Sequence, residues 1–428
     1  MLKKTTLENG IRIITERMES VRSIAFGILV NAGPRDEAAE QCGIAHLAEH
    51  MLFQGTSSRS ASQIAKLMGA AGDTMGAFTT RDYTCYYATV LDDYFPYALD
   101  LLGDIFLNSI FPTDSLVSEK DAILNEIRAE RDSPEHRVHS LLKATVWPDH
   151  NLGSSITGPP EVVKRLTRED LIYFTHEHYR ADNLIISAAG HLDHDDVVAQ
   201  VRDGFWRLSG EGVCTPVREA KFNSEVRVEY SPVSQAYFSI GLPAYPYVHE
   251  NRYTLHLLNN ILGGGMSSRF YRHIREEKGL VYHIGSQYHA YLEGGLLIIE
   301  GSTLPEYLMR VLSTVLLELY LLATREKPLN EDELWRAKMH IRGQHLISSE
   351  DTNTRMSRLA TQELYFGRQI SPDEILKEIE GVGLGLIQET AEELLDNFVK
   401  NITVAVVGPE SPGQYSEEAI KEMLAGLA

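Results

Sequence analysis

The sequence predicts an α+β protein made of two homologous, duplicated domains, each an antiparallel β-sheet covered by α-helices. Its 428 residues exceed what one hydrophobic core usually organises, since single cores stop growing at about 250 to 300 residues. Two segments in different halves of the chain align with each other. Strand-like and helical stretches follow one another in an irregular order, which is typical of α+β proteins.

The repeat is clearest in HLAEHMLFQGTSSR, which begins at His46, and HLLNNILGGGMSSR, which begins at His256, an offset of 256 − 46 = 210 residues. Both segments contain His-Leu, an apolar pair, a glycine and Ser-Ser-Arg at the same relative positions. SIAFGILVNAGPRDE also resembles YFSIGLPAYPYVHE, and ADNLIISAAG resembles VKNITVAVVG. Three separated matches predict a duplicated domain, with residues 1–212 as the first copy and 213–428 as the second. The joint is expected within residues 209–219, where Gly, Ser and Pro interrupt the periodic regions.

The pattern of apolar residues predicts the main elements of each half. Helical periodicity marks three stretches of the first half, and alternating or continuous apolar runs mark strands in both halves. In chain order, the expected strands are 11–15, 24–30, 85–91, 181–190, 226–230, 236–242, 296–302 and 399–408, and the expected helices are 60–72, 94–108 and 113–132.

Composition excludes several classes of protein. With 40 Lys and Arg against 60 Asp and Glu, the net charge is −20, which argues against nucleic-acid binding and leaves open an acidic cleft that attracts basic peptides. No apolar run is long enough for a membrane span, and no secretory signal is recognisable. The three cysteines, Cys42, Cys85 and Cys214, form no CxxC motif, which favours reduced thiols. We therefore expect a cytoplasmic protein.

Residues 43–55, GIAHLAEHMLFQG, place polar groups in an apolar helical stretch. His46 and His50 are four residues apart, so on a helix both rings lie on one face and can bind one metal ion. Glu49 lies beside that face, where it can reach a water bound to the ion. This is the inverted order of the HExxH motif of metallohydrolases. The alternative interpretation, a surface helix with solvated His and Glu, fits less well with the surrounding apolar residues.

A catalytic zinc ion needs a third protein ligand. Residues 113–132 form the best candidate helix, with Glu119, Glu126 and Glu130 on roughly one face. Spacing alone does not choose among them, and a solvated glutamate-rich face is an equally good interpretation. In the second copy, Asn259 and Asn260 replace the motif's Glu and second His, so that copy is expected to lack the metal site.

Taken together, these residues resemble the pitrilysin and mitochondrial processing peptidase family of inverted zincins, over essentially the whole chain. The resemblance rests on HLAEH, on a glutamate 76 residues beyond the second histidine (126 − 50 = 76), and on another glutamate seven residues earlier (126 − 119 = 7). It implies that His46, His50 and Glu126 bind one Zn²⁺ per chain. It also implies that Glu49 is the general base and that Glu119 orients a ligand histidine.

The resemblance extends to two substrate-contacting stretches. Arg275 and Tyr282 match a family pair with the same spacing (282 − 275 = 7) that contacts the substrate carbonyl. Residues 72–88 resemble the family's edge strand, which pairs with an extended substrate. At Gly76-Ala77-Phe78 this chain has Gly where the family usually has Asn. That departure affects the strength or selectivity of substrate docking rather than the backbone pairing.

Two other patterns are interpreted as structural. The histidine pairs His176/His178 and His191/His194 resemble an ordinary family segment. Gly263-Gly264-Gly265 lacks the frame of a phosphate loop and resembles a shortened glycine-rich loop of the noncatalytic processing-peptidase subunit, for which only flexibility is expected.

The resemblance predicts a zinc-dependent endopeptidase that hydrolyses peptides or small unfolded segments. Family members enclose the substrate with four such domains, so a chain with two is expected to form a homodimer in which each second domain faces the partner's zinc site. The alternative from another class is a noncatalytic subunit or scaffold of a processing-peptidase-like complex.

Overall fold

The computed structural model describes residues 1–70, 74–210, 218–396, 398–411 and 413–426. The chain divides into two compact units. Unit 1 comprises Met1–Arg128, Ser155–Pro216 and Leu346–Ile370, and unit 2 comprises Ala129–Ser154, Val217–His345 and Ser371–Ala428. The predicted joint between residues 212 and 213, Cys214 and the last two residues of the helix predicted at 60–72 lie outside the described residues.

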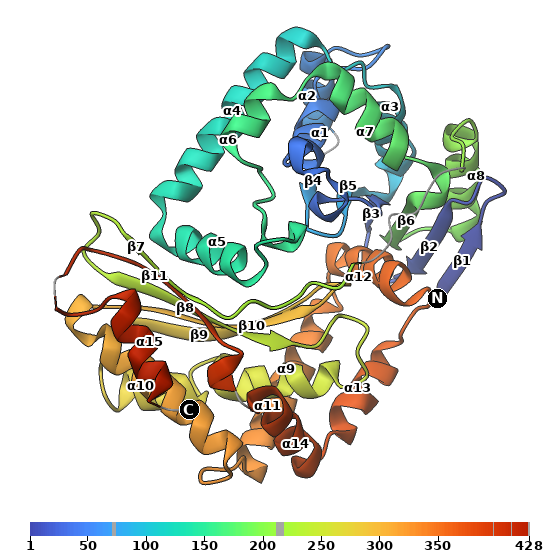
Figure 1. Ribbon diagram of the computed structural model, residues 1–428. Coiled ribbons are helices and arrows are strands. Elements are labelled where there is room, and N and C mark those ends of the chain that lie inside the picture. Colours follow the sequence, from blue (N-terminus) through green and yellow to red (C-terminus); the bar gives the residue numbers. More distant parts are fainter. Residues whose placement is uncertain (71–73, 211–217, 397, 412, 427–428) are drawn as a thin grey trace. The chain divides into compact units, whose positions relative to one another are not determined.

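A six-stranded sheet in the order β1-β2-β6-β3-β5-β4 forms the centre of unit 1 (Figure 1). All neighbouring strands are antiparallel except β2 and β6, which run parallel. The central strands β3 and β6 are buried along almost their whole length and are mostly apolar, because helices cover both of their faces. The strands are β1 (Leu2–Thr6), β2 (Arg12–Arg17), β3 (Ser23–Val30), β4 (Thr74–Thr79), β5 (Thr84–Leu91) and β6 (Leu184–Gly190).

Each face of this sheet carries its own hydrophobic core. On one face, side chains such as Phe26 and Ile28 pack with α1, α3, α7 and α8. On the other face, Ala25 and Leu29 pack against α12, which contacts β2, β3 and β6. The helices are α1 (Ile44–Leu52), α2 (Ala61–Ala70), α3 (Phe95–Asn108), α4 (Thr113–Asp132), α6 (Pro160–Arg165), α7 (Arg168–His178), α8 (His194–Phe205) and α12 (Thr352–Phe366).

Unit 2 is built on a five-stranded sheet in the order β7-β11-β8-β10-β9. Figure 1 shows α5 on one face of this sheet and α9 on the other. The strands are β7 (Val226–Tyr230), β8 (Ala236–Ala244), β9 (His283–Ala290), β10 (Gly295–Thr303) and β11 (Thr403–Gly408). The helices are α5 (Pro134–Val146), α9 (Arg252–Gly263), α10 (Leu308–Ala323), α11 (Glu331–Ser348), α13 (Pro372–Gly381), α14 (Leu384–Leu395) and α15 (Glu417–Ala425), and a π-helical segment covers Tyr271–Glu276.

The two sheets repeat the same topology, which confirms the predicted α+β architecture. The order β2-β6-β3-β5-β4 in unit 1 corresponds to β7-β11-β8-β10-β9 in unit 2, and the parallel pair recurs as β7 and β11. The sheets are therefore antiparallel except for one pair each. Both parallel pairs join strands that are far apart in the chain, with three other strands and several helices between them, and parallel pairing requires such a long connection. The apolar pattern of a strand does not reveal the direction of its neighbour.

The repeated Ser-Ser-Arg tripeptide has a similar structural role in both units. The guanidinium of Arg59 lies 2.6 Å from Asp104 and 2.7 Å from Asp100, both on α3. Arg269 is 4% exposed and makes two hydrogen bonds to Glu333 on α11, at 2.7 and 2.8 Å. Each arginine therefore fixes the segment that follows the repeated helix to a later helix.

Each unit also takes one helix from the other half of the sequence. Helix α5, from the first half, packs on β8 and β11 of unit 2 through Val138, Leu142 and Val146. Helix α12, from the second half, covers the sheet of unit 1. Amphipathic periodicity predicts that a helix has an apolar face but not which sheet that face covers.

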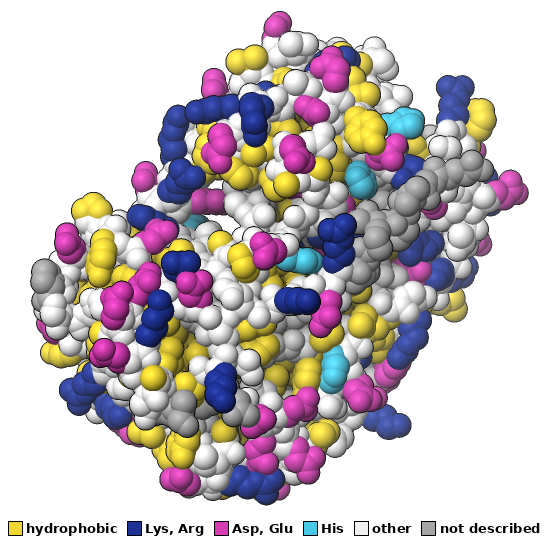
Figure 2. Space-filling model, viewed as in Figure 1, with side chains coloured by type: hydrophobic (Ala, Val, Ile, Leu, Met, Phe, Trp, Pro, Cys, Tyr) yellow, Lys and Arg dark blue, Asp and Glu magenta, His cyan; other side chains and the backbone are white. Residues whose placement is uncertain are grey.

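Two expectations from composition concern the distribution of acidic side chains on the surface and the presence of membrane-spanning helices. On the face shown in Figure 2, Asp and Glu side chains lie among Lys and Arg side chains. Within the described residues, each helix is either too short or too polar to cross a membrane.

Candidate metal centre

The candidate centre is built on α1, whose start is fixed by its backbone and by one buried carboxylate. Gly43 precedes the helix with φ +93°, a left-handed conformation that favours glycine, and a Cβ there would lie 2.6 Å from the Thr157 carbonyl oxygen. The Glu37 carboxylate accepts hydrogen bonds from the backbone N–H groups of Gly43 (2.8 Å) and Ala45 (2.9 Å). Burial raises the pKa of Glu37 to about 8, while these bonds oppose the rise.

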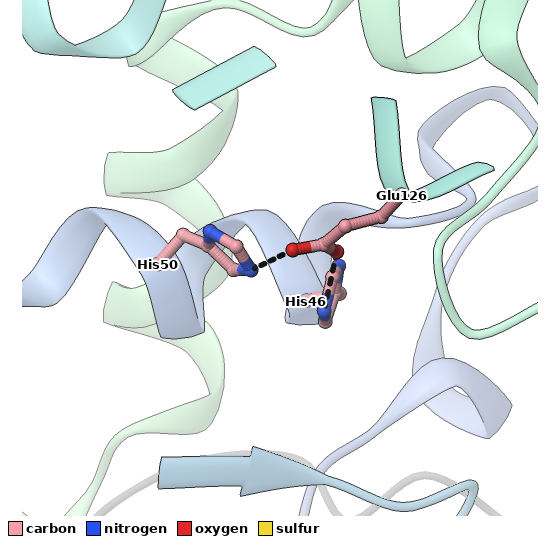
Figure 3. A group of neighbouring side chains, drawn as sticks. All are labelled: His46, His50 and Glu126. Atoms are coloured by element: carbon pink, nitrogen blue, oxygen red, sulfur yellow. Dashed lines mark ion pairs between the residues drawn. The ribbon is translucent and has the colours of Figure 1, made fainter. Parts of the chain in front are cut away.

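His46 and His50 lie on one face of α1 and point toward Glu126 of α4 (Figure 3). Their ring centroids are 4.6 Å apart. Each Nε2 atom lies 3.7 Å from a different oxygen of the Glu126 carboxylate. Burial, and secondly the neighbouring His50, lower the pKa of His46 to about 4, so this ring is neutral at physiological pH, as a metal ligand must be.

These three side chains fit a zinc ion. Their candidate ligand atoms all lie within 4.8 Å of one another. The 3.7 Å separations are too long for hydrogen bonds and are close to the spacing of roughly 3.3 Å expected for two ligands of a tetrahedral zinc with bonds of about 2.0 Å. Two imidazoles and one carboxylate are a donor set of catalytic zinc sites. Of the residues that the structure describes, no other set of three His, Cys, Asp or Glu meets the same distance limit.

The three glutamates that spacing left open on α4 are placed differently. Glu126 belongs to the group above, and Glu130 does not. The Glu119 carboxylate lies 3.0 Å from Nδ1 of His50 and accepts a hydrogen bond from the side chain of Gln54 at 2.8 Å. Glu119 is thus in contact with the ring nitrogen that does not face Glu126. The contribution of Gln54 was missed from the sequence, although it lies four residues after His50.

The third polar residue of the motif, Glu49, also faces a partner in unit 1. The hydroxyl of Thr79 donates a hydrogen bond to Oε2 of Glu49 at 2.5 Å. Burial raises the pKa of Glu49, while the hydrogen bond from Thr79 lowers it. Thr79 is a second residue that the sequence did not single out. It directly follows the predicted substrate-contacting residues, but spacing gave no sign that it reaches α1.

The predicted substrate strand is β4, at the edge of the sheet of unit 1. Residues 72 and 73 of the stretch predicted from the sequence lie outside the described residues. Phe78 packs near Tyr87, with ring centroids 5.9 Å apart, and Ala77 packs against the core that contains α1. The atoms nearest to a Cβ at Gly76 would be those of the Tyr87 side chain, beginning with its hydroxyl oxygen at 3.6 Å. The backbone of β4 therefore has no steric need for glycine at this position.

Arg275 and Tyr282 come together in unit 2. The Arg275 guanidinium lies over two aromatic rings, 4.8 Å from the centroid of Tyr271 and 5.5 Å from that of Tyr282. Arg275 lies on the π-helical segment, a conformation frequent at functional sites. The Tyr282 side chain is 79% exposed and therefore accessible to another molecule.

In unit 2, α9 occupies the position of α1 in the repeat. Asn259 and Asn260 lie on this helix, and no metal-binding group is found around them among the described residues. Gly263 and Gly264, expected only to provide flexibility, lie in close packing instead. A Cβ on Gly263 would lie 2.4 Å from the backbone nitrogen of Ser286, and one on Gly264 would lie 2.6 Å from Cα of Asn260.

The remaining histidine pairs make local contacts. His194 is buried and bonds the hydroxyls of Thr5 and Thr15, both at 2.8 Å. His191 lies 2.6 Å from Asp92. His178 packs on Phe174, and the His176 side chain is 83% exposed.

Comparisons with known proteins agree with this architecture. Residues 12–160 match the model of the insulinase family (peptidase family M16), and residues 165–341 match the M16 peptidase inactive domain. The chain is 35% identical to an uncharacterized zinc protease of Bacillus subtilis over 409 residues, covering 96% of this chain and 98% of the relative. It is 34% identical to an uncharacterized zinc protease of Streptomyces coelicolor over 423 residues, covering 97% and 91% of the two chains.

Solved structures share the fold at low sequence identity. A crystal structure described as the M16 peptidase inactive domain from Pseudomonas fluorescens superposes with a TM-score of 0.88 at 19% identity, covering 96% of this chain and 98% of that one. A protease from Helicobacter pylori gives a TM-score of 0.88 at 19% identity, covering 96% and 99%.

Proposed function

The chain belongs to the M16 (insulinase and pitrilysin) family of peptidases as a two-domain bacterial-type member, and on that premise we propose that it is a zinc-dependent endopeptidase. Its substrates would be peptides or short unfolded segments. The observation that carries the proposal is the convergence of His46, His50 and Glu126 within 4.8 Å, with Glu49 on the same helix. The family relation and the relatives named as zinc proteases support zinc as the metal.

The roles of the residues follow from their positions. His46, His50 and Glu126 would hold one Zn²⁺. When bound, the ion would lower the pKa of a coordinated water toward 7 and polarise the scissile carbonyl. Glu49 would accept the proton of the attacking water and deliver it to the leaving amine. Glu119 would orient His50 through its Nδ1 atom, which is 3.0 Å away, and such contacts of ligand histidines raise metal affinity.

The substrate would be held by backbone hydrogen bonds to β4 and by the side chains of Arg275 and Tyr282. An extended peptide can add to the free edge of β4, where Gly76, Ala77 and Phe78 would contact it. Arg275 and Tyr282 would donate hydrogen bonds to the oxygen that becomes negative during attack. Their mutual contact and the exposure of Tyr282 support this role.

We further propose a homodimer in which the second domain of each chain faces the partner's zinc site, so that two sites share one chamber. The presence of both the metal motif and the Arg/Tyr pair on one chain supports this arrangement. Mixing Glu49→Gln chains with Arg275→Ala chains should restore about a quarter of the wild-type activity after subunit exchange, because half of the dimers would be mixed and have one intact site. An active monomer in sedimentation, or no restoration by mixing, would contradict the arrangement.

The test of the function is a peptide library incubated with purified protein, with and without chelator, and read by mass spectrometry. We expect cleavage that is lost on chelation and restored by zinc. Glu49→Gln should abolish cleavage while zinc remains bound, since Glu49 is not a ligand. A wild-type protein that binds no zinc and cleaves nothing would instead favour a noncatalytic subunit or scaffold.

A further inference from the structure

One hydroxyl connects the candidate base to the strand on which substrate is expected to dock. Thr79 is the last residue of β4, and its hydroxyl donates to Oε2 of Glu49 at 2.5 Å. We propose that Thr79 is a positioning residue that holds one oxygen of Glu49 and couples the docking of an extended peptide on β4 to the orientation of this base. The proposal rests on the peptidase function proposed above and concerns a residue with no role in it so far.

The hydrogen of this hydroxyl is directed to Glu49. A threonine hydroxyl has a single hydrogen to donate. The hydroxyl of Thr84 lies 3.4 Å from that of Thr79 and donates its own hydrogen to the Ala32 carbonyl oxygen at 3.2 Å. Thr84 can therefore only accept from Thr79, across the longer distance of 3.4 Å. The Glu49 carboxylate is nearer, at 2.5 Å, and an ionised carboxylate only accepts, so the hydrogen of Thr79 is donated to Glu49. A bond to an ionised acceptor is stronger than one between neutral groups.

The register of β4 determines that this side chain faces α1. Successive side chains of a strand point to opposite faces. Met75 and Ala77 pack against the core that contains α1, which places Thr79 on the same face. Gly76 and Phe78 point to the opposite face, toward Tyr87. One strand therefore has a free edge for a peptide and, at its end, a side chain in contact with the base.

Fixing one carboxylate oxygen has a chemical consequence. A glutamate side chain has several freely rotating bonds, and a general base must be within hydrogen-bond reach of the proton it removes. With Oε2 held by Thr79, the remaining oxygen is left to exchange the proton. Since β4 gains backbone hydrogen bonds when a peptide pairs with it, a longer peptide should order the strand, Thr79 and Glu49 together.

The test compares Thr79→Val, which removes the hydroxyl and keeps the branched shape, with Thr79→Ser, which keeps the hydroxyl. We expect Thr79→Val to lower kcat by about 10- to 100-fold, with KM and zinc affinity close to wild type. Thr79→Ser should restore most of kcat. In the wild type, kcat should rise with peptide length as the substrate fills β4, and Thr79→Val should lose this dependence.

The control is Thr314→Val in unit 2, which removes a hydroxyl that donates to the Arg310 carbonyl oxygen at 2.7 Å and should leave the kinetics unchanged. A zinc-loaded, folded Thr79→Val enzyme with the kcat of the wild type would overturn the proposal. Loss of zinc in that variant, or failure of Thr79→Ser to recover kcat, would also overturn it by showing a structural role. Failure of the proposed function is distinct, because the wild type would then be inactive.

Discussion

Replacing Glu37 by Gln tests whether the helix that bears the histidines depends on a buried, titrating carboxylate. Glu37 is 6% exposed and accepts two backbone hydrogen bonds at the start of α1. Gln keeps an oxygen acceptor for this backbone and cannot ionise. We therefore expect a difference in stability between the two proteins that changes with pH.

The direction in which stability changes with pH follows from proton binding. The pKa of Glu37 rises from 4.5 to about 8 on folding, so between these values the folded state binds more protons than the unfolded state. The contribution of Glu37 to the free energy of unfolding is then complete below pH 4.5 and is lost as pH rises toward 8. Each pH unit in that window is worth about 1.4 kcal/mol. From pH 5.5 to 7.5, the free energy of unfolding of Glu37→Gln should therefore increase by about 2 to 3 kcal/mol relative to wild type.

The assay is urea unfolding of both zinc-loaded proteins at several pH values, followed by circular dichroism. Protonation of the metal ligands affects both proteins equally and cancels in the difference. Glu40→Gln, at an exposed position nearby, is the control and should give a difference that does not change with pH. A difference in stability between Glu37→Gln and wild type that does not change with pH would refute the reasoning.

Three further changes have defined outcomes. Glu119→Gln should weaken zinc binding by about 10- to 100-fold in chelator competition, because the contact that orients a ligand histidine loses its charge; Glu130→Gln should leave zinc affinity unchanged. Gly76→Asn should lower KM for extended peptides without raising kcat, because its Cβ fits and the added amide can bond the substrate; an unchanged KM would contradict this. Gly43→Ala should destabilise the fold by at least about 1 to 3 kcal/mol in urea unfolding, since φ is +93° and the new Cβ would meet Thr157; wild-type stability would refute this estimate.

The duplicated architecture was predictable because the repeat preserves both apolar pattern and local motifs. HLAEH and HLLNN lie on α1 and α9, and the strands around them pair in the same order in both units. The parallel pairing of β2 with β6 was not predictable, because the apolar pattern of a buried strand is the same whether its neighbour runs parallel or antiparallel to it. The placement of α12 on the first sheet depends on contacts between residues that are far apart in the sequence, from Ala189 with Met356 (356 − 189 = 167) to Ile14 with Met356 (356 − 14 = 342).

The candidate site was accessible to sequence reasoning to the extent that helical spacing defines it. His46 and His50 share a face because they are four residues apart, and α4 brings Glu126 to them. Spacing alone left the three glutamates of α4 equivalent. Gln54 could not be placed by this spacing, because it follows the end of α1 at Leu52. Thr79 could not be placed either, because its contact with Glu49 depends on how an edge strand packs against a helix.

The exchange of α5 and α12 constrains how this chain can be divided. A fragment ending at residue 212 would lack α12 and would expose the sheet face that contains Ile14, Leu29 and Ile185 to water. The complementary fragment would lack α5, which covers Leu296 and Val407. Expressed apart, the halves should aggregate through these faces, and co-expressed they should recombine. Although the sequence contains two repeats, neither repeat covers both faces of its own sheet, so each depends on a helix supplied by the other.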